Sequence, residues 1–258
     1  MAFEKQLHVS SEPMALHGLM GWAASNNFGR CGRIPTAALK LQQYGQSDVV
    51  RQPLAQALAF AAAFVDVVPP REVRLLPVAS RLLTVYSDAE YTPESGRPPR
   101  LGWVVFDGSE DPVVARTLLL DPAIPDQWKP RQQQIFPAES FAPLAALLDS
   151  PGIFANADVR WFIDNEAACS TLIRGASREE DVSTIAELTH LHLLRLSTRV
   201  WFEWIDSESN PSDGLSRLGL ACPLFGAQAR TAAQPDWRDL SAKSSTYLAA
   251  AGFRSNRS

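Results

Sequence analysis

The chain has 258 residues, of which 46% are hydrophobic and 20% are charged, and its formal net charge is -4. These values are typical of a globular protein and exclude a disordered chain. The acidic balance disfavours a free-standing nucleic-acid-binding module, which usually carries a basic face.

The spacing of the cysteine and histidine residues argues against a zinc site. The three cysteines are widely spaced, and no histidine stands near them at the spacing of a zinc site.

The N-terminus lacks the apolar segment of a secretion signal, and the most apolar run, residues 57–68, is too short to span a bilayer. We therefore expect an intracellular protein, in the cytoplasm or the nucleus, that does not bind a membrane.

The first part of the chain is predicted to be helical. Residues 1–34 show little periodicity, but apolar side chains recur on one helical stripe over residues 36–45 and 49–67. Pro69 and Pro70 end the second helix. The apolar faces of this pair need a partner, which can be the following domain or another protein.

Three consecutive segments then have the β-branched, apolar character of strands, and loops of hairpin length separate them. They cover residues 82–88, 101–107 and 113–120. Three antiparallel strands are therefore predicted, and the first ends in a carboxylate, Asp88.

A helix is predicted after these strands, because Pro137 suits a first helical turn and an alanine- and leucine-rich stripe follows. Glu139 is predicted to lie in that first turn. Pro143 lacks an amide proton and clashes with the preceding turn, so we expect a kink or a delayed start to the regular helix.

The most informative stretch of the chain surrounds Asp164. A near-continuous apolar run, residues 159–163, is typical of a strand covered on both faces, and it stops at Asp164. Asn165 is suited to cap the helix that follows, and Gly175 is suited to end it. A carboxylate at the carboxyl end of a strand, beside the start of a helix, is a common location for chemistry in open α/β sheets.

The last predicted elements are a long helix over residues 178–197, a fifth strand over residues 200–206 and a short final helix. Asn210 is the predicted cap of this final helix and Pro211 its first residue. Asp213 then lies in the first turn.

These elements divide the chain into three parts. Residues 1–78 form a helical segment, residues 79–220 an α/β domain, and residues 221–258 a loosely ordered tail. Trp201 and Trp204 in the fifth strand are expected to pack in the core rather than to stack on bases.

The order of the elements can bring four carboxylates together. Asp88 and Asp164 lie at one edge of the sheet if pairing changes from antiparallel to parallel between their strands, and Glu139 and Asp213 can reach the same edge. Clustered carboxylates resist joint ionisation, and hard divalent cations remove that cost. Two such ions about 3.5–4 Å apart can activate a water and stabilise a leaving oxygen. The residues therefore suggest metal-dependent phosphodiester hydrolysis.

Four segments, in this order, resemble the ribonuclease H domain of retroelement reverse transcriptases of the DIRS-like and LTR-retrotransposon type. They are Tyr86–Ala89, Glu139 with its helix, Phe162–Asn165 and Asn210–Arg217, the last being close to the pattern Asn-Pro-Ala-Asp-x-x-Ser-Arg. The resemblance covers roughly residues 80–220. It implies an α/β fold with a mixed five-stranded sheet in the order 3-2-1-4-5, in which strand 2 is antiparallel and helices flank the sheet.

The resemblance also implies a site and a substrate. Asp88, Glu139, Asp164 and Asp213 would be the catalytic residues and would bind two Mg²⁺ or Mn²⁺ ions, and the substrate would be the RNA strand of an RNA–DNA hybrid. The helical segment looks like the thumb or connection that precedes this domain. Because the polymerase palm is absent, we expect the C-terminal piece of a longer element, with a polymerase domain as its partner.

Two departures from the family pattern bear on activity. No histidine lies in the loop before Asp213, and no strongly basic helix is present, so weak affinity for a hybrid is expected in isolation. A catalytically decayed domain that binds nucleic acid or protein, and a related exonuclease, stay open as alternatives. Metal titration separates the first, and substrates with blocked ends separate the second.

Overall fold

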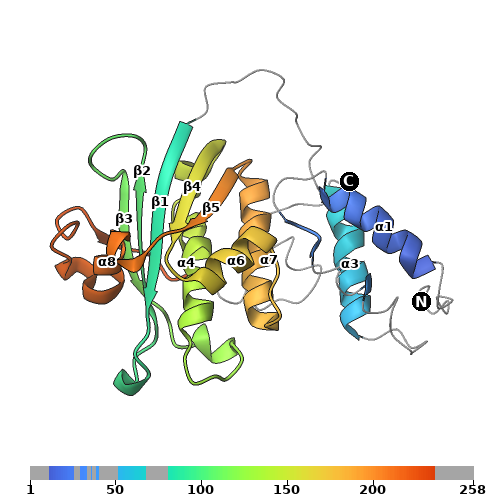
Figure 1. Ribbon diagram of the computed structural model, residues 1–258, viewed down its shortest axis with the longest axis horizontal. Helices are drawn as coiled ribbons and strands as arrows, with labels where there is room; N and C mark the ends of the chain where they lie inside the picture. The colour runs from blue at the N-terminus through green and yellow to red at the C-terminus, as the bar shows by residue number, and fades with distance from the viewer. Residues whose placement is uncertain are drawn as a thin grey trace.

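A mixed β-sheet forms the centre of the α/β domain, with helices on both of its faces (Figure 1). The computed structural model describes residues 12–25, 30–33, 36, 39–40, 52–67 and 81–235. The strands, in chain order, are β1 (Arg81–Glu90), β2 (Arg100–Phe106), β3 (Val114–Leu119), β4 (Ala157–Ile163), β5 (Arg199–Trp204) and β6 (Arg230–Thr231). Their order across the sheet is β5-β4-β1-β2-β3-β6.

The pairing directions confirm the predicted α/β topology. β1 is antiparallel to β2 and parallel to β4, and β2 is antiparallel to β3 whereas β4 is parallel to β5. The predicted order 3-2-1-4-5, with strand 2 antiparallel, is therefore confirmed. The sheet has six strands rather than five, because β6 pairs with β3 in a segment that was assigned to the tail. Residues 236–258 of that predicted tail lie outside the described residues.

Helices cover the two faces of the sheet unequally (Figure 1). Three helices lie on one face: α4 (Ile135–Asp149), α6 (Glu166–Arg174) and α7 (Glu180–Arg195). The short helix α8 (Asp213–Leu218) lies on the other face against β1 and β2. Short helical turns complete the domain: η1 (Pro93–Ser95), η2 (Pro125–Gln127), α5 (Pro151–Phe154), η3 (Ser207–Ser209) and η4 (Gly219–Ala221).

Helix α4 differs from the prediction in its start and in the effect of Pro143. It begins at Ile135, so Glu139 is its fifth residue. Glu139 therefore lies beyond the first turn, whereas the sequence predicts it within that turn. The helix also continues through Pro143, although the ring removes the amide that would bond the carbonyl of Glu139. Burial of nearly the whole helix compensates for that lost bond, since Phe141 and Leu144 on either side are at most 2% exposed.

The core between sheet and helices depends on Trp161 of β4, which is fully buried. Its ring stacks on Phe154 with 5.4 Å between centroids, and its indole nitrogen donates to Ser87 Oγ at 2.9 Å. The prediction that Trp201 and Trp204 are core residues is wrong, because they are 68% and 54% exposed. Both lie on β5, which pairs with β4 alone within the described part of the sheet and so forms its edge.

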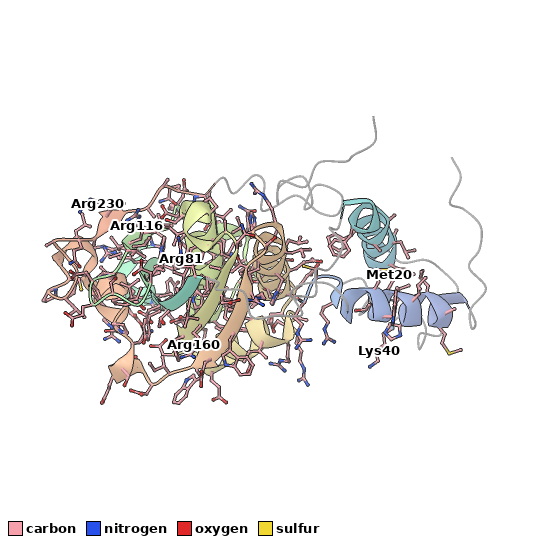
Figure 2. The ribbon with its side chains drawn as sticks, turned by 90° about the horizontal axis from the view of Figure 1, so that it is seen from above. Met20, Lys40, Arg81, Arg116, Arg160 and Arg230 are labelled. Atoms are coloured by element: carbon pink, nitrogen blue, oxygen red, sulfur yellow. The ribbon has the colours of Figure 1, made fainter. Side chains whose placement is uncertain are left out.

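The N-terminal segment contains two described helices, α1 (Glu12–Ser25) and α3 (Gln52–Val67), which share a small apolar cluster. Helix α1 was not predicted, because its apolar side chains lie around the whole axis and show no stripe. The helix predicted over residues 36–45 falls largely outside the described residues. Figure 2 shows α1 and α3 beside each other, with Met20 of α1 between them. Within the described ranges, no helix has the length and apolarity needed to cross a bilayer.

Candidate active site

Asp88 and Asp164 lie side by side because β1 and β4 are parallel neighbours. Ser87 of β1 pairs with Ile163 of β4, so the residues that follow them, Asp88 and Asp164, reach the same edge of the sheet. β4 ends there because Asn165 caps α6, its side chain accepting a hydrogen bond at 3.0 Å from an amide of the first helical turn. The predicted cap and the predicted switch from antiparallel to parallel pairing are both confirmed.

Glu139 reaches the two aspartates from α4. The backbone amide of Ala89, the residue of β1 that follows Asp88, donates a hydrogen bond to Glu139 Oε1 at 3.2 Å. The other oxygen, Oε2, has no hydrogen-bond partner, although the residue is only 3% exposed. A buried carboxylate oxygen without a partner is costly, so Glu139 has an unused acceptor within the site.

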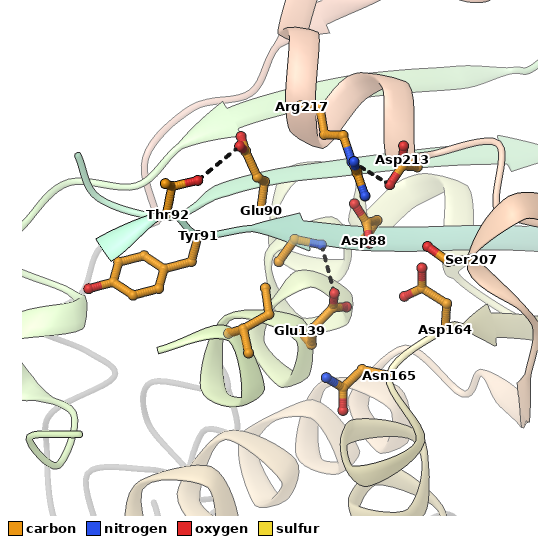
Figure 3. Close-up of a pocket in the computed structure, with 12 residues that line it drawn as sticks. Asp88, Glu90, Tyr91, Thr92, Glu139, Asp164, Asn165, Ser207, Asp213 and Arg217 are labelled. Atoms are coloured by element: carbon orange, nitrogen blue, oxygen red, sulfur yellow. Dashed lines mark hydrogen bonds and ion pairs between the residues drawn. The ribbon is translucent and has the colours of Figure 1, made fainter. Parts of the chain in front are cut away.

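The three side chains form a compact oxygen cluster. One oxygen from each of Asp88, Glu139 and Asp164 lies within 4.8 Å of the other two. Figure 3 shows them converging from β1, α4 and the end of β4. Asp88 and Glu139 are buried, whereas Asp164 is partly exposed. The cluster therefore has a buried floor and a side that opens to solvent.

The electrostatics of this cluster follow from burial and from like charges. Burial raises the pKa of Asp88 to about 7; a hydrogen bond from Ser216 opposes the rise, and the charges of Asp164 and Asp213 add to it. Burial also raises the pKa of Glu139 well above its ordinary value, and Asp88 and Asp164 add to that effect. Without a counter-charge, the cluster therefore holds protons near neutral pH.

Asp213 lies apart from this cluster but lines the same pocket. It is the first residue of α8, and its Oδ1 lies 2.7 Å from Nε of Arg217, one turn later. The pocket has a volume of about 440 Å³. It is lined by Asp88, Ala89, Glu90, Tyr91, Thr92, Ile135, Glu139, Asp164, Asn165, Ser207, Asp213 and Arg217 (Figure 3). The structure thus brings three predicted site residues together and places the fourth on the same pocket wall as Arg217.

The loop before α8 is fastened to β1 by Asn210. The predicted capping role of Asn210 is wrong, because α8 begins at Asp213 and Ser212 occupies the cap position. Instead, Asn210 is buried, accepts a hydrogen bond from Ser212 N at 3.1 Å and donates to the carbonyl of Ser87 at 3.2 Å. This bond ties the loop to the residue just before Asp88.

Ser216 is a second contact of the α8 region with the site, and sequence reasoning assigned it no role. Its hydroxyl donates to Asp88 Oδ2. The signal was present in the sequence, because Asn210 and Ser216 both belong to the segment that carried the resemblance. Spacing along the chain did not show that these two side chains fold back onto β1.

Comparisons with known proteins give a fold likeness and little more. No protein-family model and no curated protein matches the chain. Among solved structures, it is similar to the N-terminal RNase H domain of a Mycobacterium tuberculosis protein, solved as a fusion with maltose-binding protein. That match has 16% identity and a TM-score of 0.44, and covers 57% of this chain and 99% of the other.

A second similar structure is RNase H1 from the halophilic archaeon Halobacterium salinarum NRC-1. It is 17% identical with a TM-score of 0.42, and the match covers 54% of this chain and 97% of the other. Both TM-scores are below 0.5, so the functional proposal is based on the side chains of this protein rather than on these neighbours.

Proposed function

We propose that the α/β domain is a metal-dependent endonuclease of the ribonuclease H type, which hydrolyses the RNA strand of RNA–DNA hybrids. One observation chiefly supports this. Oxygens of Asp88, Glu139 and Asp164, held by three separate elements, lie within 4.8 Å of one another, and buried Glu139 Oε2 has no partner. We further propose, from the resemblance of the four segments, that the chain is the C-terminal piece of a retroelement reverse transcriptase and acts with a polymerase domain.

The donor set fits Mg²⁺ or Mn²⁺. All three clustered side chains offer hard carboxylate oxygens, and no cysteine or histidine is among the residues that line the pocket. The lining includes one cationic side chain, Arg217, and it already pairs with Asp213. Once ionised, the cluster of Asp88, Glu139 and Asp164 would carry an excess of negative charge that a divalent cation would neutralise. These three residues would bind the cation, and Asp213 would contribute to a second one.

Bound divalent cations would supply Lewis acidity for in-line displacement at a phosphodiester. The protein would contribute a fixed arrangement of ligands. The Ala89 amide holds Glu139, and Ser216 holds Asp88, so neither carboxylate has to reorganise when the cation binds. Partly exposed Asp164 borders the open side of the cluster, from which a nucleic-acid backbone would approach.

The Asp164→Asn variant tests the nuclease proposal. The amide has nearly the same shape as the carboxylate but neither its charge nor its affinity for a hard cation. With Mg²⁺ or Mn²⁺ and a labelled RNA–DNA hybrid, we expect wild-type protein to cleave the RNA strand and D164N to lose activity at least about 100-fold. Asp126→Asn is the control, since Asp126 is an exposed aspartate that does not line the pocket. Circular dichroism checks that all three proteins are folded.

Substrate variants separate the alternatives. Cleavage of a hybrid with blocked ends indicates an endonuclease, whereas loss of cleavage on blocking indicates an exonuclease. Matched RNA and DNA duplexes should remain intact if the hybrid is the substrate. Calorimetry that finds no saturable Mn²⁺ binding to wild-type protein would indicate a decayed domain and refute the proposal, as would full activity of D164N.

A further inference from the structure

We propose that Ser216 is a positioning residue, whose hydroxyl holds one oxygen of Asp88 and thereby fixes the orientation in which this carboxylate meets Glu139 and Asp164. The inference rests on the proposed metal-dependent function and adds a residue outside the carboxylate set. Ser216 lies on α8, on the opposite face of the sheet from the helix that carries Glu139. The site is thus assembled from both faces of the sheet.

The contact of Ser216 with Asp88 is fully buried. Ser216 has no exposed surface, and Asp88 is 4% exposed. Ser216 Oγ contacts Asp88 Oδ2 and also lies 2.8 Å from the carbonyl of Asp213. A hydroxyl has a single proton to donate, and a charged acceptor forms the stronger bond, so an ionised Asp88 receives it.

The backbone around Ser216 is held tightly against β2. Gly102 of β2 pairs with Asp88 in the sheet, and a Cβ at Gly102 would lie only 2.6 Å from Ser216 N. Only a glycine therefore allows α8 to approach so closely. The approach is fixed by two further hydrogen bonds, in which Thr117 Oγ1 donates to the carbonyl of Leu215 at 3.0 Å and Arg100 to that of Arg217 at 2.9 Å. The hydroxyl of Ser216 is thus presented to Asp88 by a rigid support.

Ser212 provides a matched control within the same segment. It is also fully buried, and its hydroxyl donates to Asn210 Oδ1 at 2.6 Å, within the loop itself. Ser212→Ala and Ser216→Ala therefore delete the same buried hydroxyl from the same structural unit. They differ in that the hydroxyl of Ser216 alone reaches Asp88.

The experiment compares wild type, S216A and S212A as full-length chains. Calorimetry measures Mn²⁺ binding to the metal-free proteins, and hybrid cleavage is followed as a function of Mn²⁺ concentration and of hybrid concentration. Loss of a residue that orients a metal ligand typically weakens metal affinity about 10–100-fold. For S216A we expect a loss of that size in Mn²⁺ affinity, an equal rise in the Mn²⁺ concentration for half-maximal cleavage, and little change in KM for the hybrid. For S212A we expect Mn²⁺ affinity within about threefold of wild type.

The outcomes separate this inference from the proposed function. Wild-type protein that binds no Mn²⁺ overturns both. Wild-type binding with equal losses in S216A and S212A overturns the positioning role alone, because both serines then act only through the fold. Unchanged affinity in S216A also overturns it. Should S216A fail to fold, Ser216→Cys fills nearly the same space with a weaker donor, and unchanged Mn²⁺ affinity in that variant counts equally against the inference.

Discussion

Replacing Asp88 by asparagine should stabilise the metal-free protein at alkaline pH while abolishing its proposed activity. In the absence of a cation, the buried carboxylate of Asp88 lies beside the carboxyl groups of Glu139 and Asp164, and the charge of Asp164 opposes its ionisation. Burial raises that pKa from 3.8 to about 7. A neutral amide of the same shape avoids the cost of ionising this group inside the protein.

The size and the sign of the effect follow from proton linkage. A carboxyl group whose pKa is higher in the folded protein stabilises the fold fully below its unfolded pKa, and the contribution is lost as the pH rises through the folded pKa. For Asp88 the loss extends from about pH 4 to about pH 7 and amounts to about 4 kcal/mol, of which about 3 kcal/mol falls above pH 5. Because an amide also needs hydrogen-bond partners, we expect D88N to gain about 2–4 kcal/mol at pH 8.

Urea unfolding in EDTA, followed by tryptophan fluorescence at pH 5 and pH 8, measures the difference. We expect the advantage of D88N over wild type to grow by about 3 kcal/mol between these pH values. D126N, which removes the charge of an exposed aspartate, should show no such growth. Added Mg²⁺ should stabilise wild type more than D88N, because it binds the intact cluster. A D88N protein that is no more stable than wild type at pH 8, or an advantage that does not change with pH, would refute the reasoning.

Two further predictions concern residues that are not members of the carboxylate cluster. Gly102→Ala should lower the free energy of unfolding by about 1–3 kcal/mol and abolish hybrid cleavage, because its Cβ would collide with α8, whereas Gly152→Ala, with nothing within 4 Å of the added Cβ, should do neither. Equal urea midpoints for the two variants would contradict this. Arg131→Met should lower stability by about 2 kcal/mol at pH 7 without changing cleavage, because Arg131 donates two hydrogen bonds of 2.9 Å to Asp181. Burial works to raise the pKa of Asp181, but hydrogen bonds from Arg131 and Lys129 lower it overall. Since a lowered pKa stabilises the fold only above the unfolded value, the difference between R131M and wild type should shrink below about pH 4 in acid titrations, and a constant difference would count against the pairing.

Several features of the fold could be predicted because they depend on neighbouring residues. The apolar run that stops at Asp164, and the asparagine that follows it, specify a strand that ends and a helix that begins within a few positions. The same kind of local signal located β1, with Asp88 near its end. The order 3-2-1-4-5 came instead from the resemblance of four segments to the ribonuclease H family, and the observed strand order agrees with it.

Other features depended on which elements pack against each other, and local patterns did not contain them. Trp201 has a large aromatic side chain of the kind that usually packs in a core, yet it is exposed on β5, the edge strand of the sheet. Pro143 should disturb a helix, yet α4 continues because the sheet and its neighbouring helix bury it. The two residues of β6 carry no recognisable strand signal and are ordered by pairing with β3.

The sequence by itself determined strands β1 to β5, the helix that Asn165 caps and the carboxylates near the ends of β1 and β4, because each depends on residues only a few positions apart. The tertiary structure decided how these carboxylates are held. Asn210 bonds to Ser87 across 123 positions of the chain, and Ser216 bonds to Asp88 across 128. Contacts over such separations form only when two elements are packed together, and here that packing requires the space left by a glycine at position 102.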